Sequence, residues 1–114
     1  MSLQVLDFEY HADAPKPILA DRGHFGVTGS GDMEVIMEKK ELGGAVKVRV
    51  HTPVRGFDAV WKKVLERFVT ENHLGNLSME INDDNATPVV VSLRLRQALA
   101  EVNSEGSVRH VVME

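Results

Sequence analysis

The sequence predicts an α+β domain: a two-layer sandwich in which an antiparallel sheet of about four strands carries two helices on one face, in the order β-β-β-α-β-α. Three observations lead to this prediction. Several segments alternate apolar and polar residues as strands do, two segments repeat apolar residues at helical spacing, and glycine or proline stands between them. At 114 residues, the chain is expected to form a single domain, residues 1–114, with a core of its own.

The first half of the chain is predicted to consist of strands. Residues 3–10 alternate apolar and polar side chains, and the two prolines within residues 12–17 make that segment a connection. A second strand begins near Asp32 and continues through residues 33–40. Residues 45–51 alternate valine with charged or polar residues and form the clearest strand in the sequence.

The pair Gly43-Gly44 between these last two segments suggests a two-residue hairpin turn, which requires positive φ angles. In that register Met37 lies opposite Val50 and Glu38 lies opposite Arg49, so the apolar faces of the two strands agree. We therefore expect these two strands to be neighbours in the sheet.

The second half contains the two helices. Residues 57–73 repeat apolar side chains at spacings of three and four, and this stripe holds the chain's single tryptophan, Trp61, which is expected in the core. Gly75 suits the position just past the helix, and residues 77–82 alternate as a further strand. Residues 88–102 form the second helix, because Thr87 can cap it and proline is tolerated in its first turn. The tail, residues 103–114, is a turn followed by a short segment able to add an edge strand.

Composition excludes several classes of function. The net charge of −4 argues against nucleic-acid binding. The chain shows neither a signal peptide nor an apolar run long enough to cross a membrane, so we expect a cytoplasmic protein. Because there are no cysteines, disulfides and thiolate metal sites are excluded, and any thiol chemistry requires a thiol brought by another molecule.

Most candidate chemical sites have simpler explanations. The histidines show no metal-binding spacing, and residues 82–85 (NDDN) lack the regular ligand spacing of a calcium loop and suit a turn into a helix. Ser30 does not fit the nucleophile elbow of serine hydrolases, nor does its loop fit a phosphate-binding or dinucleotide motif. An enzyme using Asp32 and Glu34 would lack an evident base or nucleophile partner. The histidines are His11, His24, His51, His73 and His110.

The segment GVTGSGDMEV, residues 26–35, holds a single serine between two glycines at the start of a strand. One explanation is a tight turn or bulge, in which glycine adopts torsions that other residues resist. The other is that Gly29 and Gly31 remove bulk on both sides so that a modifying enzyme can reach the Ser30 hydroxyl. Asp32 is two residues past Ser30 and so lies on the same side of an extended chain as Ser30. It is either a solvated acid or a group that helps present the Ser30 hydroxyl or bind the metal of the modifying transferase.

Three segments together resemble the acyl carrier protein (delta subunit) family of malonate decarboxylase: GVTGSGDMEV, GFDAVWKKVLERF and MEINDDNATPVVVSLRLRQAL. The resemblance extends over residues 3 to about 102, and the serine context is more distantly similar to the acyl carrier subunit of citrate lyase. It implies a non-catalytic carrier in which Ser30 bears 2′-(5″-phosphoribosyl)-3′-dephospho-coenzyme A through a phosphodiester bond. The arm ends in a thiol that carries acetyl or malonyl as a thioester.

The resemblance also implies the partners. They are the acyltransferase and decarboxylase subunits of malonate decarboxylase, the holo-carrier synthase that attaches the arm, and a malonyltransferase that loads it.

The Asp-Ser-Leu motif of phosphopantetheine carriers is absent, and Ser92 is expected to be structural within a helix. From the residues alone, a small module that binds a protein or ligand non-covalently through its polar sheet face remains an alternative.

Overall fold

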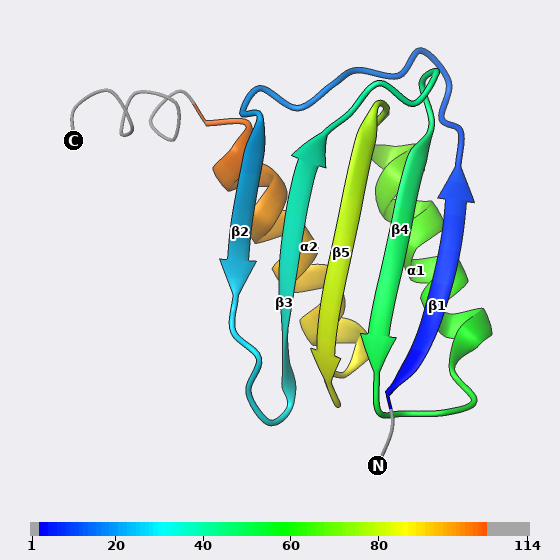
Figure 1. The fold of residues 1–114 in the computed structure, drawn as a ribbon, viewed down its shortest axis with the longest axis vertical. Helices are drawn as coiled ribbons and strands as arrows, with labels where there is room; N and C mark the ends of the chain where they lie inside the picture. The colour runs from blue at the N-terminus through cyan, green and yellow to red at the C-terminus, as the bar shows by residue number, and fades with distance from the viewer. Residues whose placement is uncertain (1–2, 105–114) are drawn as a thin grey trace.

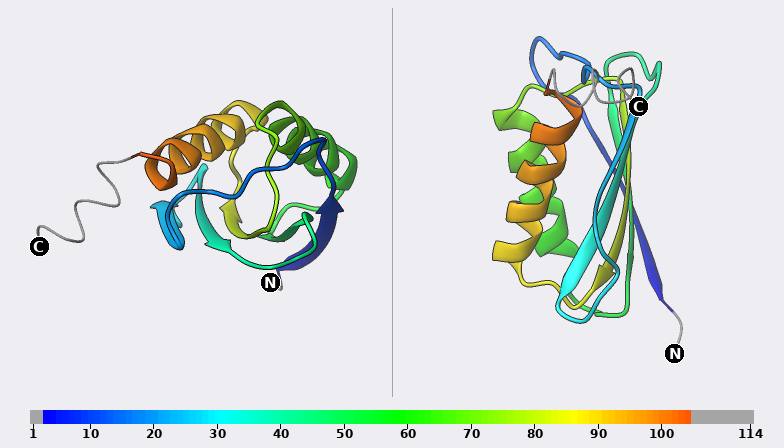
Figure 2. Two further views of the ribbon diagram at one scale, coloured as in Figure 1. Left: turned by 90° about the horizontal axis from the view of Figure 1, so that it is seen from above. Right: turned by 90° about the vertical axis from the view of Figure 1, so that its left-hand side faces the viewer.

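In the computed structural model, which describes residues 3–104, five strands form one sheet and two helices cover one of its faces (Figure 1). The edge-on views show two layers, with the other face of the sheet uncovered (Figure 2). The predicted two-layer α+β class is confirmed, with five strands in place of about four. The elements are β1 (Gln4–Tyr10), β2 (Arg22–Gly26), β3 (Asp32–Lys39), β4 (Val46–Thr52), α1 (Asp58–Glu71), β5 (Leu77–Asp84) and α2 (Pro88–Val102).

The strands lie in the order β1-β4-β5-β3-β2, and β4 and β5 are parallel while the other neighbouring pairs are antiparallel. The sheet is therefore mixed, and the prediction of a wholly antiparallel sheet with β3 beside β4 is wrong. β5 lies between them, so Met37 faces Met79 of β5 and Val50 faces Ile81 of β5. The sequence correctly predicts the alternation of buried and more exposed residues along β3 and β4. It does not predict that each of these strands pairs with β5.

The loop between β3 and β4 shows why the expected hairpin does not form. The side-chain Oδ1 of Asn76 accepts hydrogen bonds from the backbone N–H groups of Leu42 and Gly44, each at 2.9 Å. Asn76 directly precedes β5, so these bonds hold the loop around the start of the strand that separates β3 from β4. The helix α1 crosses between β4 and β5, and such a crossover is the usual way to join parallel neighbours.

The edge strand β2 was not predicted, because its sequence, RGHFG, is short and contains two glycines. The structure gives a packing reason for one of them. A Cβ atom on Gly23 would overlap the side chain of Val102 at the end of α2. The glycine thus lets the helix approach the edge of the sheet closely. Because glycine is unusual inside strands, the same residue makes β2 hard to recognise from the sequence.

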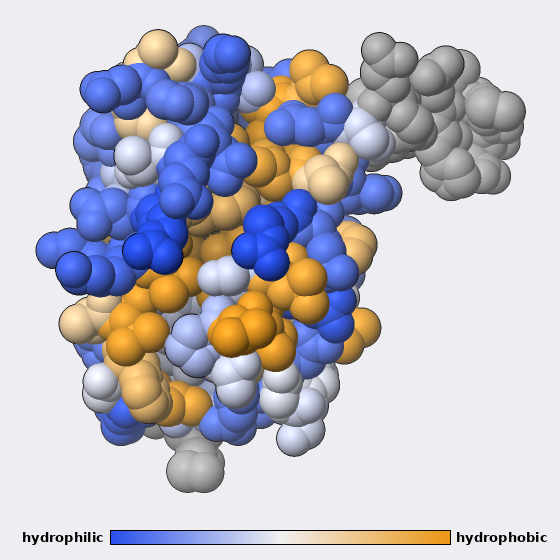
Figure 3. All heavy atoms as spheres, turned by 180° about the vertical axis from the view of Figure 1, so that it is seen from behind, coloured by the Kyte–Doolittle hydropathy of each residue, from blue (hydrophilic) through white to orange (hydrophobic). Residues whose placement is uncertain are grey.

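The core lies between the sheet and the helices. Trp61 is 6% exposed and packs with Leu65, Phe68 and Val69 of α1, which confirms the predicted stripe over these positions. At the N-terminal end of the same stripe, Phe57 and Val60 stay 50% and 39% exposed. The space-filling view of the helical face shows hydrophobic residues gathered over its lower half, whereas hydrophilic residues are more frequent in its upper half (Figure 3).

Two smaller expectations have different outcomes. Gly75 does not end α1, since the helix stops at Glu71 and the residue with positive φ is His73, at 49°. Gly75 instead lies where a Cβ would overlap Pro15, which fixes a close crossing of two loops. The edge strand expected in the tail falls in residues 105–114, outside the described residues.

Gly26, the last residue of β2, should be the least replaceable glycine of the hairpin. Its φ is +92°, and a Cβ there would overlap the backbone oxygen of Met33. Gly43 also has a positive φ, +64°, but open space around it. We expect Gly43→Ala to cost about 1–2 kcal/mol and Gly26→Ala at least about 1 kcal/mol more, as measured by denaturant unfolding. Equal losses would mean that the Met33 carbonyl moves aside freely.

Candidate functional site

Ser30 lies in the loop that joins β2 to β3, and this loop is at the lower end of the sheet in Figure 1. A four-residue turn, Gly29 to Asp32, is closed by a 2.9 Å hydrogen bond from the Asp32 N–H to the Gly29 carbonyl. Gly31, third in the turn, has a φ of +77°, the conformation that a type II turn requires there and that glycine adopts most easily. The turn therefore places the exposed Ser30 side chain at its outer corner.

The turn is fixed to the sheet and open on its outer side. The Gly31 N–H donates a 2.7 Å hydrogen bond to the carbonyl of Asp84, the last residue of β5. No atom lies within 4 Å of where a Gly31 Cβ would stand, and the nearest one to a Gly29 Cβ would be a methyl of Val27 at 3.8 Å. Another protein can therefore approach Ser30 from both sides without displacing a side chain.

The Ser30 hydroxyl is accessible but not activated. Within residues 3–104 it makes no hydrogen bond. The nearest acidic residue along the chain, Asp32, is engaged by Arg94, and the nearest histidine, His24, bonds Glu34 at 2.7 Å. The hairpin thus supplies position, and a base for deprotonating the hydroxyl must come from elsewhere.

Asp32 forms a two-pronged ion pair with Arg94 of α2. Arg94 Nε and Nη2 donate to the two carboxylate oxygens of Asp32 at 2.8 and 2.6 Å, and the Met33 N–H adds a bond at 2.7 Å. Arg94 also donates to Gln97 at 3.0 Å and lies over the Phe25 ring, 6.0 Å from its centroid. These contacts tie β2 and β3, on either side of the turn, to the second layer of the protein.

Neither sequence-based explanation of Asp32 describes this arrangement fully. Its carboxylate is mostly covered, with 20% of the side chain exposed, so it is not a freely solvated acid. The Arg94 hydrogen bonds, followed by that of the Met33 N–H, lower the pKa of Asp32 below its ordinary value. Arg94 was not singled out in the sequence, because it lies 62 residues away and no local pattern connects the two. The pair joins Asp32, the last residue of the turn, to α2.

Replacing Asp32 with asparagine should lower the stability of the fold near neutral pH. Because the folded-state pKa of Asp32 is depressed, the pair stabilises the protein above the unfolded-state pKa, and that stabilisation disappears as the pH falls through the folded-state pKa. The gap in melting temperature between the parent and Asp32→Asn should therefore close on acidification. Asp21→Asn, at a fully exposed acid whose contact with Lys39 is long, at 3.9 Å, is the matched control and should show no such gap. A gap that persists in acid would contradict the role of the ion pair.

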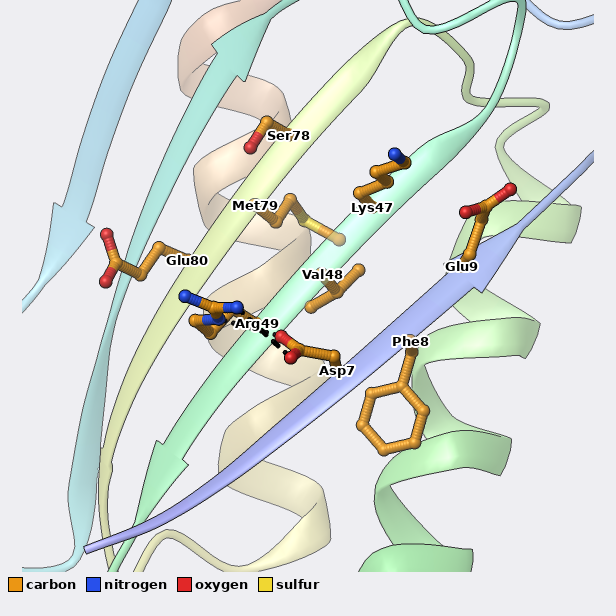
Figure 4. Close-up of a pocket in the computed structure, with 9 residues that line it drawn as sticks. All are labelled: Asp7, Phe8, Glu9, Lys47, Val48, Arg49, Ser78, Met79 and Glu80. Atoms are coloured by element: carbon orange, nitrogen blue, oxygen red, sulfur yellow. Dashed lines mark hydrogen bonds and ion pairs between the residues drawn. The ribbon is translucent and has the colours of Figure 1, made fainter.

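The uncovered face of the sheet is polar, as expected, and most of its charges are paired with each other. Arg49 donates to Asp7 at 2.8 and 3.2 Å, and His51 lies 3.0 Å from Glu80. Figure 4 shows Asp7, Arg49 and Glu80 among the residues that line a depression of about 500 Å³ on this sheet. Nearer the turn, Glu34 bonds both His24 and Asn82, each at 2.7 Å, and these bonds lower its pKa. The face therefore has few unpaired charges with which to hold a small ligand.

The remaining candidates are accounted for by the fold. Of residues 82–85, the first three end β5 and only Asn85, with a φ of +67°, begins the turn into α2, where the Ala86 N–H donates to Asp83 Oδ1 at 2.9 Å. Ser92 is half-buried within α2, as predicted. Across residues 3–104, no three His, Asp or Glu side chains come together to hold a metal ion. In the same range, neither helix has the length and apolar character needed to cross a membrane.

Sequence comparisons match most of the chain to known proteins. The sequence model for ACP, the malonate decarboxylase delta subunit (MdcD), matches residues 20–102. The malonate decarboxylase acyl carrier protein of Malonomonas rubra is 53% identical over 102 residues, which cover 90% of this chain and 91% of that protein. The protein of the same name from Burkholderia cepacia is 42% identical over 106 residues, which cover 90% of this chain and 93% of the relative.

A solved structure has the same fold. A chain in the crystal structure of a Pseudomonas malonate decarboxylase hetero-tetramer in complex with malonate superimposes with a TM-score of 0.76 and 33% sequence identity. The match covers 87% of this chain and 98% of that chain. The similarity therefore includes both the sheet and the helices.

Proposed function

The chain belongs to the malonate decarboxylase delta subunit family, and from this premise we propose that residues 1–114 form one acyl carrier domain of a malonate decarboxylase. In this role the chain carries an acyl group between the active sites of other subunits and does not catalyse a reaction. The composition is compatible with this role, because without cysteine the chain has no thiol of its own on which to form a thioester.

The attachment point is Ser30, and the observation that carries this assignment is its position at the outer corner of a glycine-flanked turn. The Ser30 oxygen forms a bond to the phosphorus of an activated phosphoric anhydride, the bond from phosphorus to the leaving group breaks, and a base of the transferring enzyme takes the serine proton. The space beside Gly29 and Gly31 suits such a step, because the enzyme must close around the backbone to reach the oxygen.

The attached group is 2′-(5″-phosphoribosyl)-3′-dephospho-coenzyme A. When bound, it supplies a thiol that holds acetyl or malonyl as a thioester, which stabilises the carbanion left by decarboxylation. The chain's own contribution is to hold Ser30 at a fixed, exposed point. Gly29 and Gly31 shape the turn, and Asp32 holds it to α2 through Arg94. Asp32→Asn should therefore also slow attachment of the group.

The partners follow from this cycle. A holo-carrier synthase attaches the arm, a malonyltransferase loads it, the acyltransferase subunit exchanges acetyl for malonyl, and the decarboxylase subunits release carbon dioxide. The solved neighbour comes from a hetero-tetramer, which supports an assembly of several different subunits. A carrier of the citrate lyase type would use the same attachment chemistry, but the two relatives described above carry the malonate decarboxylase name.

The experiment that tests the proposal is intact-mass spectrometry after co-expression with the family's holo-carrier synthase. The chain should gain the mass of the phosphoribosyl-dephospho-coenzyme A group, located on a peptide that contains Ser30. Expression without the synthase gives the control mass. If the mass is unchanged in both cases, the carrier function fails and the non-covalent binding module becomes the better explanation.

A further inference from the structure

An apolar groove opens on the helical face between the N-terminal parts of α1 and α2. It encloses about 310 Å³, and its walls include Phe57, Val60, Trp61, Val64 and Val91. The hydrophobic patch on the lower half of Figure 3 lies over these parts of the helices. Volumes of about 300 Å³ and mostly apolar walls are typical of sites for small organic molecules.

The start of α1 has a feature that packing alone does not explain. Phe57 is the N-cap residue of α1, makes no side-chain capping bond, and is 50% exposed at the groove. Helices strongly prefer Ser, Thr, Asp or Asn at this position, because their oxygens satisfy a free N–H of the first turn. A large apolar side chain placed there and left half-exposed indicates a surface that is covered when a ligand binds.

A buried acidic group, Asp83, is among the residues that line the groove. Asp83 is 6% exposed, accepts a 2.7 Å hydrogen bond from the Thr52 hydroxyl and a 2.9 Å bond from the Ala86 N–H, and borders the groove. None of the described residues that line the groove is lysine, arginine or histidine. The groove therefore provides apolar walls and a carboxylate, and no cationic side chain to pair with an entering anion.

The groove lies at the same end of the molecule as Ser30. The β2–β3 turn, the end of β5 and the start of α2 all lie at the lower end of Figure 1. The Gly31 N–H bonds the Asp84 carbonyl at 2.7 Å, and the two neighbours of Asp84, Asp83 and Asn85, both border the groove. A long, flexible arm attached to Ser30 thus starts beside the rim of the groove.

We propose that this groove binds the acetyl-pantetheine end of the arm carried by Ser30 and excludes the malonyl form; this inference rests on the proposed function. The methylene, methyl and acetyl groups are uncharged and suit the apolar walls. A malonyl group would bring a carboxylate into a site that is lined by no cationic side chain and already contains Asp83, and burying a charge without an ion-pair partner is unfavourable. The acyl group therefore determines whether the arm rests on the carrier or is free to enter a partner's active site.

The absence of cysteine allows a direct test by chemical tethering. A Ser30→Cys variant is alkylated with a pantetheine arm that ends in one of three stable amides: ¹³C-methyl acetyl, malonyl, or malonyl methyl ester. The indole N–H resonance of Trp61, the chain's single tryptophan, is followed by NMR, together with nuclear Overhauser effects from the acetyl methyl group. The methyl ester is as large as malonyl but uncharged, so it separates charge from size.

The acetyl arm should shift the Trp61 resonance and give Overhauser effects to the groove, and the methyl ester should shift it as well. The malonyl arm at pH 7 should leave it where it lies in the arm-free variant. Val60→Glu, in the groove wall, should abolish the acetyl shift, whereas Val89→Glu, on a helical residue that is 77% exposed and outside the lining, should keep it. The acetyl arm on Ser78→Cys, on the uncovered face of the sheet, should give no shift.

Two results would overturn the inference. Equal shifts from the acetyl and malonyl arms would remove the discrimination by charge. No shift from the acetyl arm would remove the arm as occupant and leave the groove as a contact surface for an apolar side chain of a partner subunit. Because the tether is chemical, a failed synthase reaction at Ser30 would refute the proposed function and leave these spectra unaffected.

Discussion

Replacing Ser30 with alanine should leave the chain folded and abolish attachment of the prosthetic arm completely. The hydroxyl is exposed and makes no hydrogen bond within residues 3–104, so its removal should change the free energy of unfolding by no more than about 0.5 kcal/mol. The same change removes the oxygen that forms the phosphodiester bond. After co-expression with the synthase, the parent should show the added mass and Ser30→Ala should show none.

Two other hydroxyl residues provide matched controls. Thr28 is exposed in the same loop, and Ser78 lies half-buried on β5. Thr28→Ala and Ser78→Ala should both accept the arm, because neither residue is at the corner of the turn. The assembled complex with Ser30→Ala should also release no carbon dioxide from malonate. Added mass on any peptide that lacks Ser30 would refute the assignment.

Elements defined by neighbouring residues were predictable from the sequence. The helix α2 begins at Pro88 as expected, and the Thr87 hydroxyl accepts the Val90 N–H at 3.3 Å. The strict alternation of β4 corresponds to alternating burial along the strand. The turn that holds Ser30 could likewise be located, because Gly29 and Gly31 mark it directly. In each case the signal lies within a few residues of the feature that it predicts.

Features that depend on distant residues could not be predicted in this way. The position of β5 between β3 and β4 depends on the α1 crossover and on the bonds that Asn76 makes with the preceding loop. The strand β2 is recognisable only once Val102 is seen packing against Gly23. The Asp32–Arg94 pair joins β3 to the last helix. The turn at Ser30 was therefore predictable from the sequence, whereas the contacts that join it to the helices were not.

Replacing Trp61 with alanine should destabilise the fold more than any other single change considered above. The side chain is 6% exposed and belongs to the core between α1 and the sheet. Tyr10 of β1 donates a 2.9 Å hydrogen bond to the carbonyl of the adjacent Lys62, so α1 has little freedom to move into the space left behind. We expect a loss of about 3–5 kcal/mol in the free energy of unfolding, the usual range for a large core aromatic.

The matched control for Trp61 is Phe57, which borders the same groove but is 50% exposed. Phe57→Ala should cost less than about 1 kcal/mol in denaturant unfolding, because the ring buries little area in the free protein. Trp61→Phe should keep much of the stability, since a smaller ring still fills part of the site. A loss below about 1 kcal/mol for Trp61→Ala would place its indole outside the core. The ring would then serve only as a wall of the groove, and the two helices would have to be held to the sheet by other residues.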